Sequence, residues 1–226
     1  KAIVRVMPGA ALAAAVLLLA IRPPAEDRVI FLNVGQGDCC LVQTAAGENY
    51  LFDCGSSSRS KTGQYVLLPA LKYYGIRRLD GVFLSHSDGD HMNGISELLE
   101  LAGDNHLTIR QVLLPAIEEG VREEAFGGLL AVADAAGKSQ GSSMRVAWVG
   151  AGDAWNCGEA RFVCLHPQKG CRGVEGNAYS QCFYADFGSF SLLLTGDVEG
   201  VGEQALLAEL KERKIDSVTV LKTAHH

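Results

Sequence analysis

The first half of the chain is a series of short apolar stretches separated by glycine, proline and small polar residues. Short runs rich in β-branched and aromatic side chains are typical of strands, whereas apolar residues spaced three and four apart indicate a helix with one buried face. Turn residues at 35–37 and 46–48 join three of these runs, which predicts an antiparallel meander. The pattern predicts strands at residues 28–34, 38–44, 49–53 and 79–84, and helices at 65–74 and 95–101.

The second half of the chain repeats this alternation. The pattern predicts strands at residues 109–114, 144–149, 160–165, 180–187, 190–195 and 217–221, helices at 122–136 and 202–213, and a polar loop at 137–143. We expect the last strand, at 217–221, to be buried. No stretch between 29 and 226 resembles a linker between domains, so these residues are predicted to form one domain. Strands and helices interspersed in two similar halves favour an α+β fold, with two sheets packed together and helices on the outside.

An apolar segment precedes this domain. Residues 2–21 are apolar apart from Arg5, and a helix needs about 20 apolar residues to cross a bilayer. A signal peptide is the alternative, but the chain begins with Lys1 and no clear cleavage site of small residues precedes Arg22. We therefore expect residues 1–22 to be the C-terminal part of a transmembrane helix. The basic residues on its two sides leave its orientation in the membrane open.

Two prolines follow the apolar segment, and they predict a stiff linker at 23–28, because paired prolines cannot continue a helix. The domain at 29–226 then stops within what resembles a longer motif. We expect the chain to be a fragment of a larger membrane protein, with this domain incomplete at its C-terminal end.

The composition limits the functions that this chain can have. It has 226 residues, of which 48% are hydrophobic and 20% charged, enough to build a substantial core. A net charge of −6 argues against a protein that binds phosphate backbones over its whole surface. Nucleic acid remains a possible substrate if a local groove is basic or if bound metal ions supply positive charge. Arg77, Arg78 and Lys138 are candidate phosphate contacts, although isolated basic residues usually belong to a solvated surface.

Seven cysteines is a high number, but none forms a Cys-x-x-Cys pair of the kind found in zinc ribbons or redox sites. Cys39, Cys40 and Cys54 are expected to be small buried hydrophobic residues. The later four could contain a disulfide if the domain faces an oxidising space. They are Cys157, Cys164, Cys171 and Cys182.

The segment 85–91 concentrates metal-binding side chains at the end of an apolar strand. It places two imidazoles, His86 and His91, and two carboxylates, Asp88 and Asp90, within six positions. Such side chains converging without a cation would suffer carboxylate repulsion and desolvation, and a divalent metal ion removes this conflict. The alternative is a solvated loop in which Asp90 only caps the following helix.

Two further strand ends carry matching ligands. An apolar strand ends at Gly196-Asp197, and another ends in the adjacent histidines His225 and His226. Alone, the first could be an ordinary turn and the second an artificial addition to the chain. Three strand ends with ligands at one sheet edge make a stronger case for a metal site than any one of them.

The segment 86–91 resembles the His-x-His-x-Asp-His signature of the metallo-β-lactamase superfamily, and its His-x-Asp-x-Asp-His form is similar to that of the ComEC-type competence proteins. The resemblance covers nearly all of residues 29–226 and implies an αβ/βα four-layer sandwich. Six stretches carry it in the family's order: Asn-Val-Gly-Gln-Gly-Asp at 33–38, Phe-Asp-Cys-Gly at 52–55, the cluster at 86–91, Asn-Ala-Tyr-Ser at 177–180, Leu-Thr-Gly-Asp at 194–197 and Leu-Lys-Thr-Ala-His-His at 221–226.

The resemblance also implies the roles of the site residues. His86 and Asp88 would bind a first metal ion, Asp90 and His91 a second, and Asp197 would bridge the two. His225 or His226 would complete the ligands of the second ion, and the strand register favours His225. Three residues would orient these ligands, although a turn role is as plausible for each. They are Gln36, Asp38 and Asp53.

One departure from the wider superfamily concerns the metal. The third histidine expected before the bridging aspartate has no clear equivalent, and Asn177 takes its place in the order of motifs. His166 lies nearby, but a His-Pro pair after a strand more often belongs to a turn. Asp88 and Asn177 in place of imidazoles would make the first site rich in oxygen, which shifts the preference from zinc towards manganese or magnesium. We expect two divalent ions, either zinc or manganese.

Two ions that share a water predict a hydrolase, with Asp90 accepting the proton of the water. The resemblance implies a nuclease that cleaves DNA phosphodiesters, with single-stranded DNA at an uptake channel and the rest of its own membrane channel as partners. It also implies a cell-membrane protein whose hydrolase domain is extracytoplasmic. Two alternatives remain: a hydrolase of the same fold that acts on another ester or a lactam, and a non-catalytic module that binds DNA or a partner at the channel.

Overall fold

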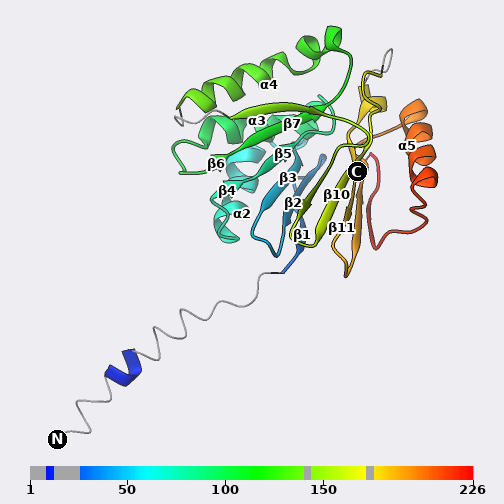
Figure 1. Cartoon of the computed structure of the whole chain (residues 1–226). Helices are drawn as coiled ribbons and strands as arrows, with labels where there is room; N and C mark the ends of the chain where they lie inside the picture. Colours follow the sequence, from blue (N-terminus) through cyan, green and yellow to red (C-terminus); the bar gives the residue numbers. More distant parts are fainter. Residues whose placement is uncertain (1–8, 13–25, 140–143, 172–175, 226) are drawn as a thin grey trace, which may run out of the picture.

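The computed structural model describes residues 9–12, 26–139, 144–171 and 176–225. Two β-sheets pack face to face, and helices cover their outer faces, so that the molecule has four layers (Figure 1). This arrangement confirms the predicted α+β fold, the αβ/βα four-layer sandwich. The expected transmembrane helix at 1–22 falls almost wholly outside the described residues. Within the described part of the chain, no helix is both long and apolar enough to cross a membrane.

The first sheet has six strands in the order β1-β2-β3-β5-β7-β8. The first three form the expected antiparallel meander, and the last three continue from β3 in parallel. Consequently β1, β3, β5, β7 and β8 all begin at one edge of the sheet, which we call the amino edge, and all end at the opposite carboxyl edge. The strands are β1 (Arg28–Phe31), β2 (Cys39–Gln43), β3 (Asn49–Cys54), β5 (Gly81–Phe83), β7 (Gln111–Pro115) and β8 (Arg145–Val149).

Three helices cover the outer face of this sheet: α2 (Leu68–Tyr73), which follows a π-helical turn at Gly63–Leu67, α3 (Gly89–Leu101) and α4 (Glu119–Ser139). Their apolar faces and the facing strand residues form one buried cluster, in which Leu51, Leu84 and Leu98 are fully enclosed. A small parallel pair, β4 (Arg78–Leu79) and β6 (Thr108–Ile109), extends the amino edge.

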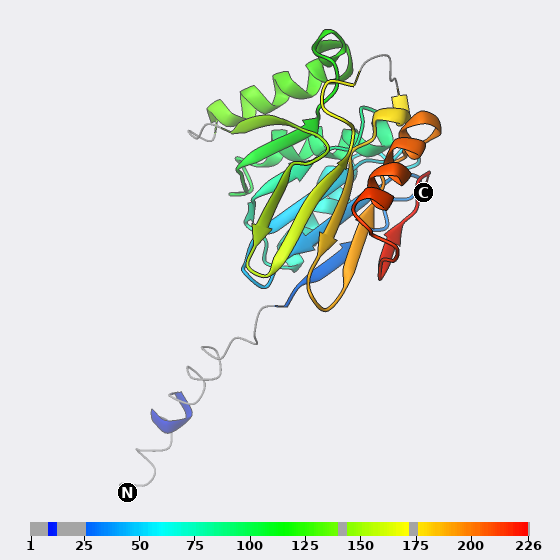
Figure 2. The same ribbon diagram turned by 45° about the vertical axis from the view of Figure 1, so that its right-hand side comes forward.

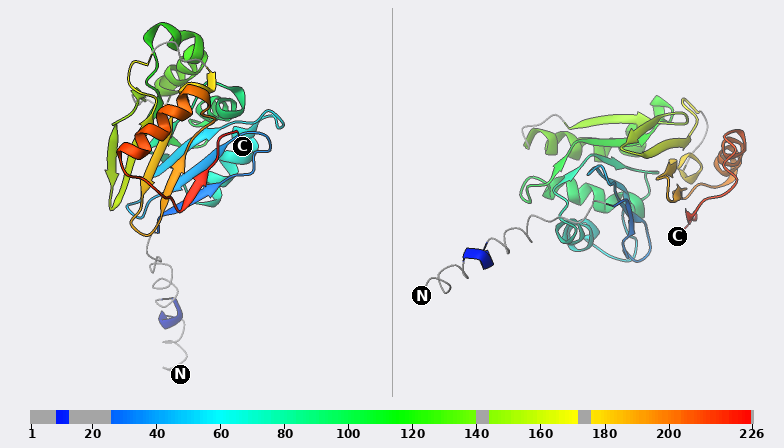
Figure 3. Two further views of the ribbon diagram at one scale, coloured as in Figure 1. Left: turned by 90° about the vertical axis from the view of Figure 1, so that its right-hand side faces the viewer. Right: turned by 60° about the horizontal axis from the view of Figure 1, so that its bottom comes forward.

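The second sheet has five strands in the order β13-β12-β11-β10-β9, and α5 (Gly200–Glu212) lies on its outer face (Figure 2). Aromatic rings fill the space between the two sheets; Phe52 and Phe83 stack with their centroids 4.6 Å apart. Figure 3 shows α5 on the opposite side of the sandwich from α2, α3 and α4. The strands are β9 (Ala154–Cys157), β10 (Ala160–His166), β11 (Cys182–Asp186), β12 (Ser191–Leu194) and β13 (Val220–Lys222), and a 3₁₀ helix covers Gly176–Tyr179.

The structure corrects several details of the predicted elements. The last strand is wrong as a buried strand: β13 pairs with β12 at the border of the described sheet, and the side chain of Leu221 is 52% exposed. The predicted loop at 137–143 is wrong at its start, because α4 continues to Ser139. β9 was not predicted, since its four residues are too few to show an alternating pattern. The seven cysteines are all free thiols, so the later four contain no disulfide here.

Candidate metal centre

The four side chains of the 86–91 cluster lie where β5 ends and α3 begins. The apolar residues before Ser85 are buried in the sheet, and the chain then emerges at the carboxyl edge and enters α3 at Gly89. His86 and His91 are buried, with exposed fractions of 1% and 0%. Asp88 is exposed at the helix N-cap. The imidazoles therefore point into the protein while this carboxylate faces the outside.

Two glycines allow neighbouring loops to approach the first turn of α3. A Cβ atom on Gly37 would lie 2.5 Å from the carbonyl oxygen of Asp90, and one on Gly55 would lie 2.5 Å from the backbone nitrogen of His91. The loop carrying Asp38 uses this space, and its backbone N–H donates to the Asp90 carbonyl at 3.2 Å. Side chains at either glycine would push the two loops away from the helix that carries the ligands.

The second sheet contributes Asp197 to the same place. Gly196, just before it, has φ +53°, which an L side chain rarely adopts, and a Cβ there would lie 2.7 Å from that of Ser85. The carboxylate oxygen Oδ2 of Asp197 lies 3.2 Å from Nε2 of His91. The centre is thus assembled from both halves of the sandwich.

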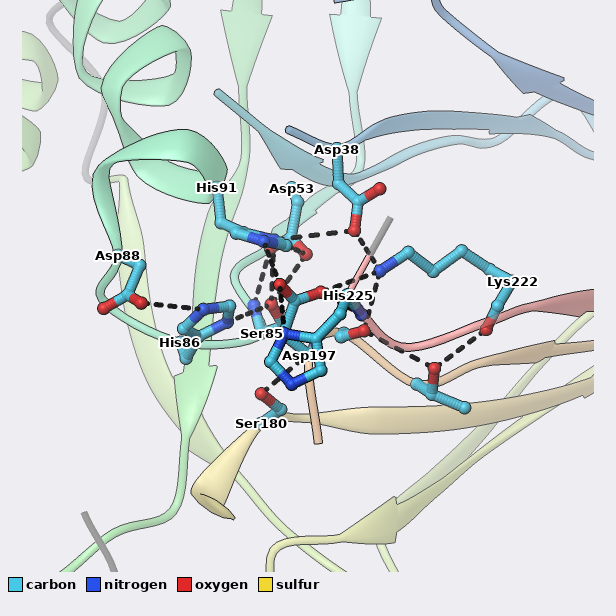
Figure 4. Close-up of polar contacts among 12 residues, drawn as sticks. Asp38, Asp53, Ser85, His86, Asp88, His91, Ser180, Asp197, Lys222 and His225 are labelled. Carbon is cyan, nitrogen blue, oxygen red and sulfur yellow. Dashed lines mark hydrogen bonds and ion pairs between the residues drawn. The ribbon is translucent and has the colours of Figure 1, made fainter. Parts of the chain in front are cut away.

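Three side chains of the described residues form a cluster that could hold a metal ion. One ligand atom each of His86, His91 and Asp197 lies within 4.8 Å of the others, and all three residues are buried. Nε2 of His86 is buried without a hydrogen bond, and Asp88 Oδ2 lies 3.6 Å from it (Figure 4). A buried imidazole nitrogen that has no hydrogen-bond partner and lies beside carboxylates is a suitable ligand for a divalent cation.

Asp53 orients both imidazoles. Its Oδ2 accepts hydrogen bonds from Nδ1 of His91 at 3.0 Å and from the Ser85 hydroxyl at 2.7 Å, while its Oδ1 accepts from the Ser85 N–H at 2.7 Å. The Ser85 oxygen in turn lies 2.9 Å from Nδ1 of His86 and can accept its proton. With both Nδ1 atoms acting as donors, the neutral imidazoles present the lone pairs of Nε2 to the centre, as metal-binding histidines do.

The charges of the cluster compensate one another in the absence of a cation. Burial lowers the pKa of His91, but the carboxylates of Asp53 and Asp197 outweigh this and raise it to about 10. Burial and the neighbouring His91 lower the pKa of His86. Burial raises the pKa of Asp197, but its contacts with His91 and Lys222 prevail and lower it. Without a metal ion, a proton on His91 therefore compensates the negative charges of Asp53 and Asp197.

Lys222 is a part of the centre that the sequence analysis did not single out. Its ammonium forms ion pairs with Asp38 and with Asp197 Oδ1, the second at 3.1 Å, and it donates to the Gly196 carbonyl at 2.6 Å. Burial lowers the pKa of Lys222, but Asp38 and Asp197 outweigh it and raise the pKa. Its signal in the sequence is its place in the matched stretch at 221–226, three residues before the first of the terminal histidines.

A second group of possible ligand atoms in the described chain consists of Asp38, Asp53 and His91. These atoms are already engaged: Asp38 pairs with Lys222, and Asp53 accepts from His91 and Ser85. The group therefore contacts His91 on the side away from Asp197, and the orienting role expected of Asp38 and Asp53 stays a prediction.

Comparison with known proteins identifies the family. The model of the metallo-β-lactamase superfamily matches residues 32–163, which is more than half of the chain. This chain belongs to the metallo-β-lactamase superfamily. The solved structure of a metallo-β-lactamase from Cronobacter sakazakii with a HARLDQ motif has the same fold, with a TM-score of 0.54 and 15% identity over 93% of this chain and 81% of the other.

Among curated proteins, the chain is similar to proteins named for competence and for recombination. It is 30% identical over 220 residues to Competence protein ComA of Neisseria gonorrhoeae, covering 94% of this chain and 26% of that protein. It is 27% identical over 216 residues to ComE operon protein 3 of Bacillus subtilis, covering 89% and 25%. Recombination protein 2 of Haemophilus influenzae is 29% identical over 196 residues, covering 86% and 21%. The chain spans about a quarter of the length of these relatives.

Among the other residues of the superfamily motifs, His225 lies beside the cluster of His86, His91 and Asp197 (Figure 4). Asp90 lies half-buried in the first turn of α3. His225 donates its backbone N–H to Asp197 Oδ1 at 3.1 Å, and its Nδ1 lies 3.7 Å from Asp197 Oδ2. Its Nε2 lies 3.1 Å from a carboxylate oxygen of Glu199, and His226 is outside the described residues. Gln36 is exposed, and its backbone N–H donates to the Ser58 hydroxyl at 2.8 Å.

The candidates for the third histidine of the superfamily lie on the 3₁₀ helix and beside it. Asn177 is on that helix, and its side-chain oxygen is buried without a hydrogen bond. His166 is buried beneath it, and its Nε2 donates to the Ala178 carbonyl at 2.8 Å. His166 is in neither ligand group, which agrees with a structural role in the turn.

The basic residues considered as phosphate contacts lie far from the centre. Arg78 is in β4 at the amino edge, and Arg77 precedes it, whereas the ligands occupy the carboxyl edge. These two arginines therefore do not contact a phosphate at the metal centre, and a phosphate contact elsewhere stays a prediction.

Proposed function

We propose that this chain is the metal-dependent hydrolase domain of a DNA-uptake membrane protein and that it cleaves DNA phosphodiesters. The observation that carries the proposal is the buried cluster of His86, His91 and Asp197, with the unpaired Nε2 of His86 at its centre. Homologues named for competence and recombination support DNA as the substrate.

The residues of the motifs would hold two divalent ions, zinc or manganese. His86 and Asp88 would bind the first and Asp90 and His91 the second, with Asp197 between them and His225 or His226 completing the second. Imidazole nitrogens suit zinc, and the additional carboxylates suit manganese. Bound ions of this kind lower the pKa of a water molecule and stabilise the charge that develops on a phosphoryl oxygen.

The chain's own residues supply binding, orientation and proton transfer. Asp53 and Ser85 hold both imidazoles in the tautomer that binds a cation. Asp90 would accept the proton of the attacking water. Lys222 reduces the negative charge of Asp38 and Asp197, which would otherwise repel the phosphates of a polynucleotide.

The homology also supports proposals on partners and location. The substrate would be single-stranded DNA at the uptake channel, and the partner would be the channel portion of the same membrane protein. The domain would then lie on the extracytoplasmic side of the cell membrane.

A nuclease assay tests the proposed function. The full chain is incubated with an end-labelled single-stranded oligonucleotide and manganese or zinc, beside β-lactam and phosphocholine ester substrates. We expect cleavage of DNA that Asp197→Asn and Asp90→Ala abolish, whereas Asp134→Asn, on the exposed face of α4, leaves it unchanged. Turnover of only the small substrates would overturn the nuclease assignment. Less than one bound metal per chain and no activity with any substrate would favour the DNA- or partner-binding module.

A further inference from the structure

Arginines mark the amino edge of the first sheet, opposite the metal centre. Five strands begin at this edge, and an arginine lies at or within three residues before the start of four of them. Only β3 begins without one. The arginines are Arg28 at β1, Arg77 and Arg78 before β5, Arg110 before β7 and Arg145 at β8.

Backbone hydrogen bonds join the strand starts that carry Arg77, Arg110 and Arg145, although these residues are distant in the sequence. The Arg77 carbonyl accepts from Thr108 N–H, in the strand next to Arg78, at 3.0 Å. The Arg110 carbonyl accepts from Arg145 N–H at 3.1 Å. The parallel order of the strands therefore converts scattered residues into one basic edge.

The positive charge of this edge is exposed. All five arginines are exposed, and within the described part of the chain no carboxylate lies within ion-pair distance of Arg28, Arg77 or Arg145. Asp80 pairs with the other two but is itself buried.

Of the other carboxylates near this edge, Asp27 and Glu48 form hydrogen bonds within the fold, whereas Glu26 and Asp104 are exposed. Asp27 accepts the Ala45 N–H at 2.8 Å, and Glu48 accepts the Tyr50 hydroxyl. Beside the arginines, Tyr73 is 83% exposed at the end of α2. Tyrosines are enriched at the membrane–water interface, at the level of the lipid headgroups.

The apolar N-terminal segment reaches the domain at this same edge. β1 begins at Arg28, and the apolar run in the sequence ends at Ile21, so the residues between them span at most about 25 Å. If the run is embedded in a bilayer, the amino edge is held near the headgroups. The carboxyl edge, which carries Asp38, Asp53, Asp88 and Asp197, then faces away from the membrane.

We propose that the amino edge docks on an anionic lipid surface and thereby presents the metal centre to the aqueous side. This inference rests on the membrane part of the proposed function, not on its metal or nuclease part. A polynucleotide is the other anionic polymer that could occupy the edge, but a strand bound there would lie on the far side of the sandwich from the metal centre. Each basic residue near the surface strengthens binding to an anionic lipid membrane roughly fivefold.

Hydrogen–deuterium exchange on the full chain in nanodiscs tests this docking. Two segments at the edge, residues 75–80 and 104–110, are compared in discs of phosphatidylglycerol and of phosphatidylcholine. We expect slower exchange of both segments in the anionic discs and loss of this protection at high salt, because the Debye length shrinks to about 3 Å at 1 M.

Charge reversal provides the matched controls. Arg77→Glu and Arg145→Glu should each lower the equilibrium constant of docking at least roughly fivefold, whereas Lys61→Glu, exposed on the loop after β3, should leave it unchanged. Equal exchange in the two lipids, or protection that survives both arginine reversals, would overturn the proposal. Protection by a single-stranded oligonucleotide in neutral discs, stronger than that by anionic lipid, would assign the edge to nucleic acid instead. Because the readout uses neither metal nor cleavage, failure here is distinguishable from failure of the nuclease proposal.

Discussion

Asp53 determines the chemistry of the centre although it is not among the residues expected to bind a cation. One of its oxygens accepts from the Nδ1–H of His91 and from the Ser85 hydroxyl. An amide at this position would present a donor to one of these groups and favour the wrong tautomer of His91. We therefore expect Asp53→Asn to weaken metal binding roughly 10- to 100-fold.

Isothermal titration with zinc or manganese measures the effect of Asp53→Asn. Asp134→Asn on the exposed face of α4 serves as the control, because it removes a carboxylate at a distance from the centre. An unchanged dissociation constant for Asp53→Asn would show that the orientation of the imidazoles does not depend on this carboxylate.

The raised pKa of His91 predicts how the stability of the metal-free domain depends on pH. The ordinary value is 6.5 and the folded value about 10, so the protonated imidazole is favoured by folding. Its contribution is fully present below about pH 6.5, declines as the pH rises, and is lost above about pH 10. Denaturant unfolding with chelator, at pH 6 and pH 9, should show a fall in stability for the native chain.

His91→Gln is the control for this pH dependence, since the buried thiols also ionise at high pH and contribute a decline of their own. The variant should show a smaller decrease between the two pH values. Equal decreases in the native chain and the variant would contradict the assignment to His91.

At the scale of elements, the close packing of three segments positions the ligands. The loop of Gly37, the turn of Gly55 and the first turn of α3 are in backbone contact. A Cβ at Gly55 would lie 2.4 Å from the carbonyl carbon of Asp90, closer than such atoms approach. We expect Gly55→Ala to displace the start of α3 and to abolish tight metal binding.

Gly89→Ala is the matched control for Gly55→Ala. Gly89 begins α3 itself, yet no atom lies within 4 Å of the Cβ that would be added. Alanine is also favoured over glycine in a helix, so the control should be as stable as the native chain or more so. Metal titration of both variants would contradict the argument if they lost affinity equally.

The elements differ in how well local pattern predicts them. The antiparallel meander and α5 follow from the spacing of apolar residues, because each buries one face within its own segment. The burial of β13 could not be predicted, since an apolar sequence does not reveal whether a strand has a neighbour on both sides. β9 was not predicted for another reason, because its four residues are too few to show an alternating pattern.

On the scale of the whole molecule, the centre joins the two halves of the sandwich. His86 and His91 come from the first sheet and α3, and Asp197 comes from the second sheet. A metal ion bound to all three stabilises the folded state by about 2.7 kcal/mol at a concentration of 100 times the dissociation constant. Removal by a chelator should therefore lower the melting temperature by roughly 5 to 10 °C.

Thermal unfolding with and without chelator measures this stabilisation. Asp197→Asn removes the ligand from the second sheet, so its melting temperature should respond less to the chelator than that of the native chain. Equal responses would mean that the metal does not join the two halves.

The sequence by itself determined the superfamily, the four-layer fold and the segments that carry candidate ligands. It could do so because strand ends, glycines and clustered histidines and aspartates are local features with a fixed order along the chain. Only the tertiary structure decided which of these side chains meet: it brought Asp197 to His86 and His91, engaged Asp53 as their orienting acceptor, and placed Lys222 among the carboxylates. It also placed the arginines together at the far edge of the sheet. Contacts between strands depend on sheet order and register, which no local pattern of residues encodes.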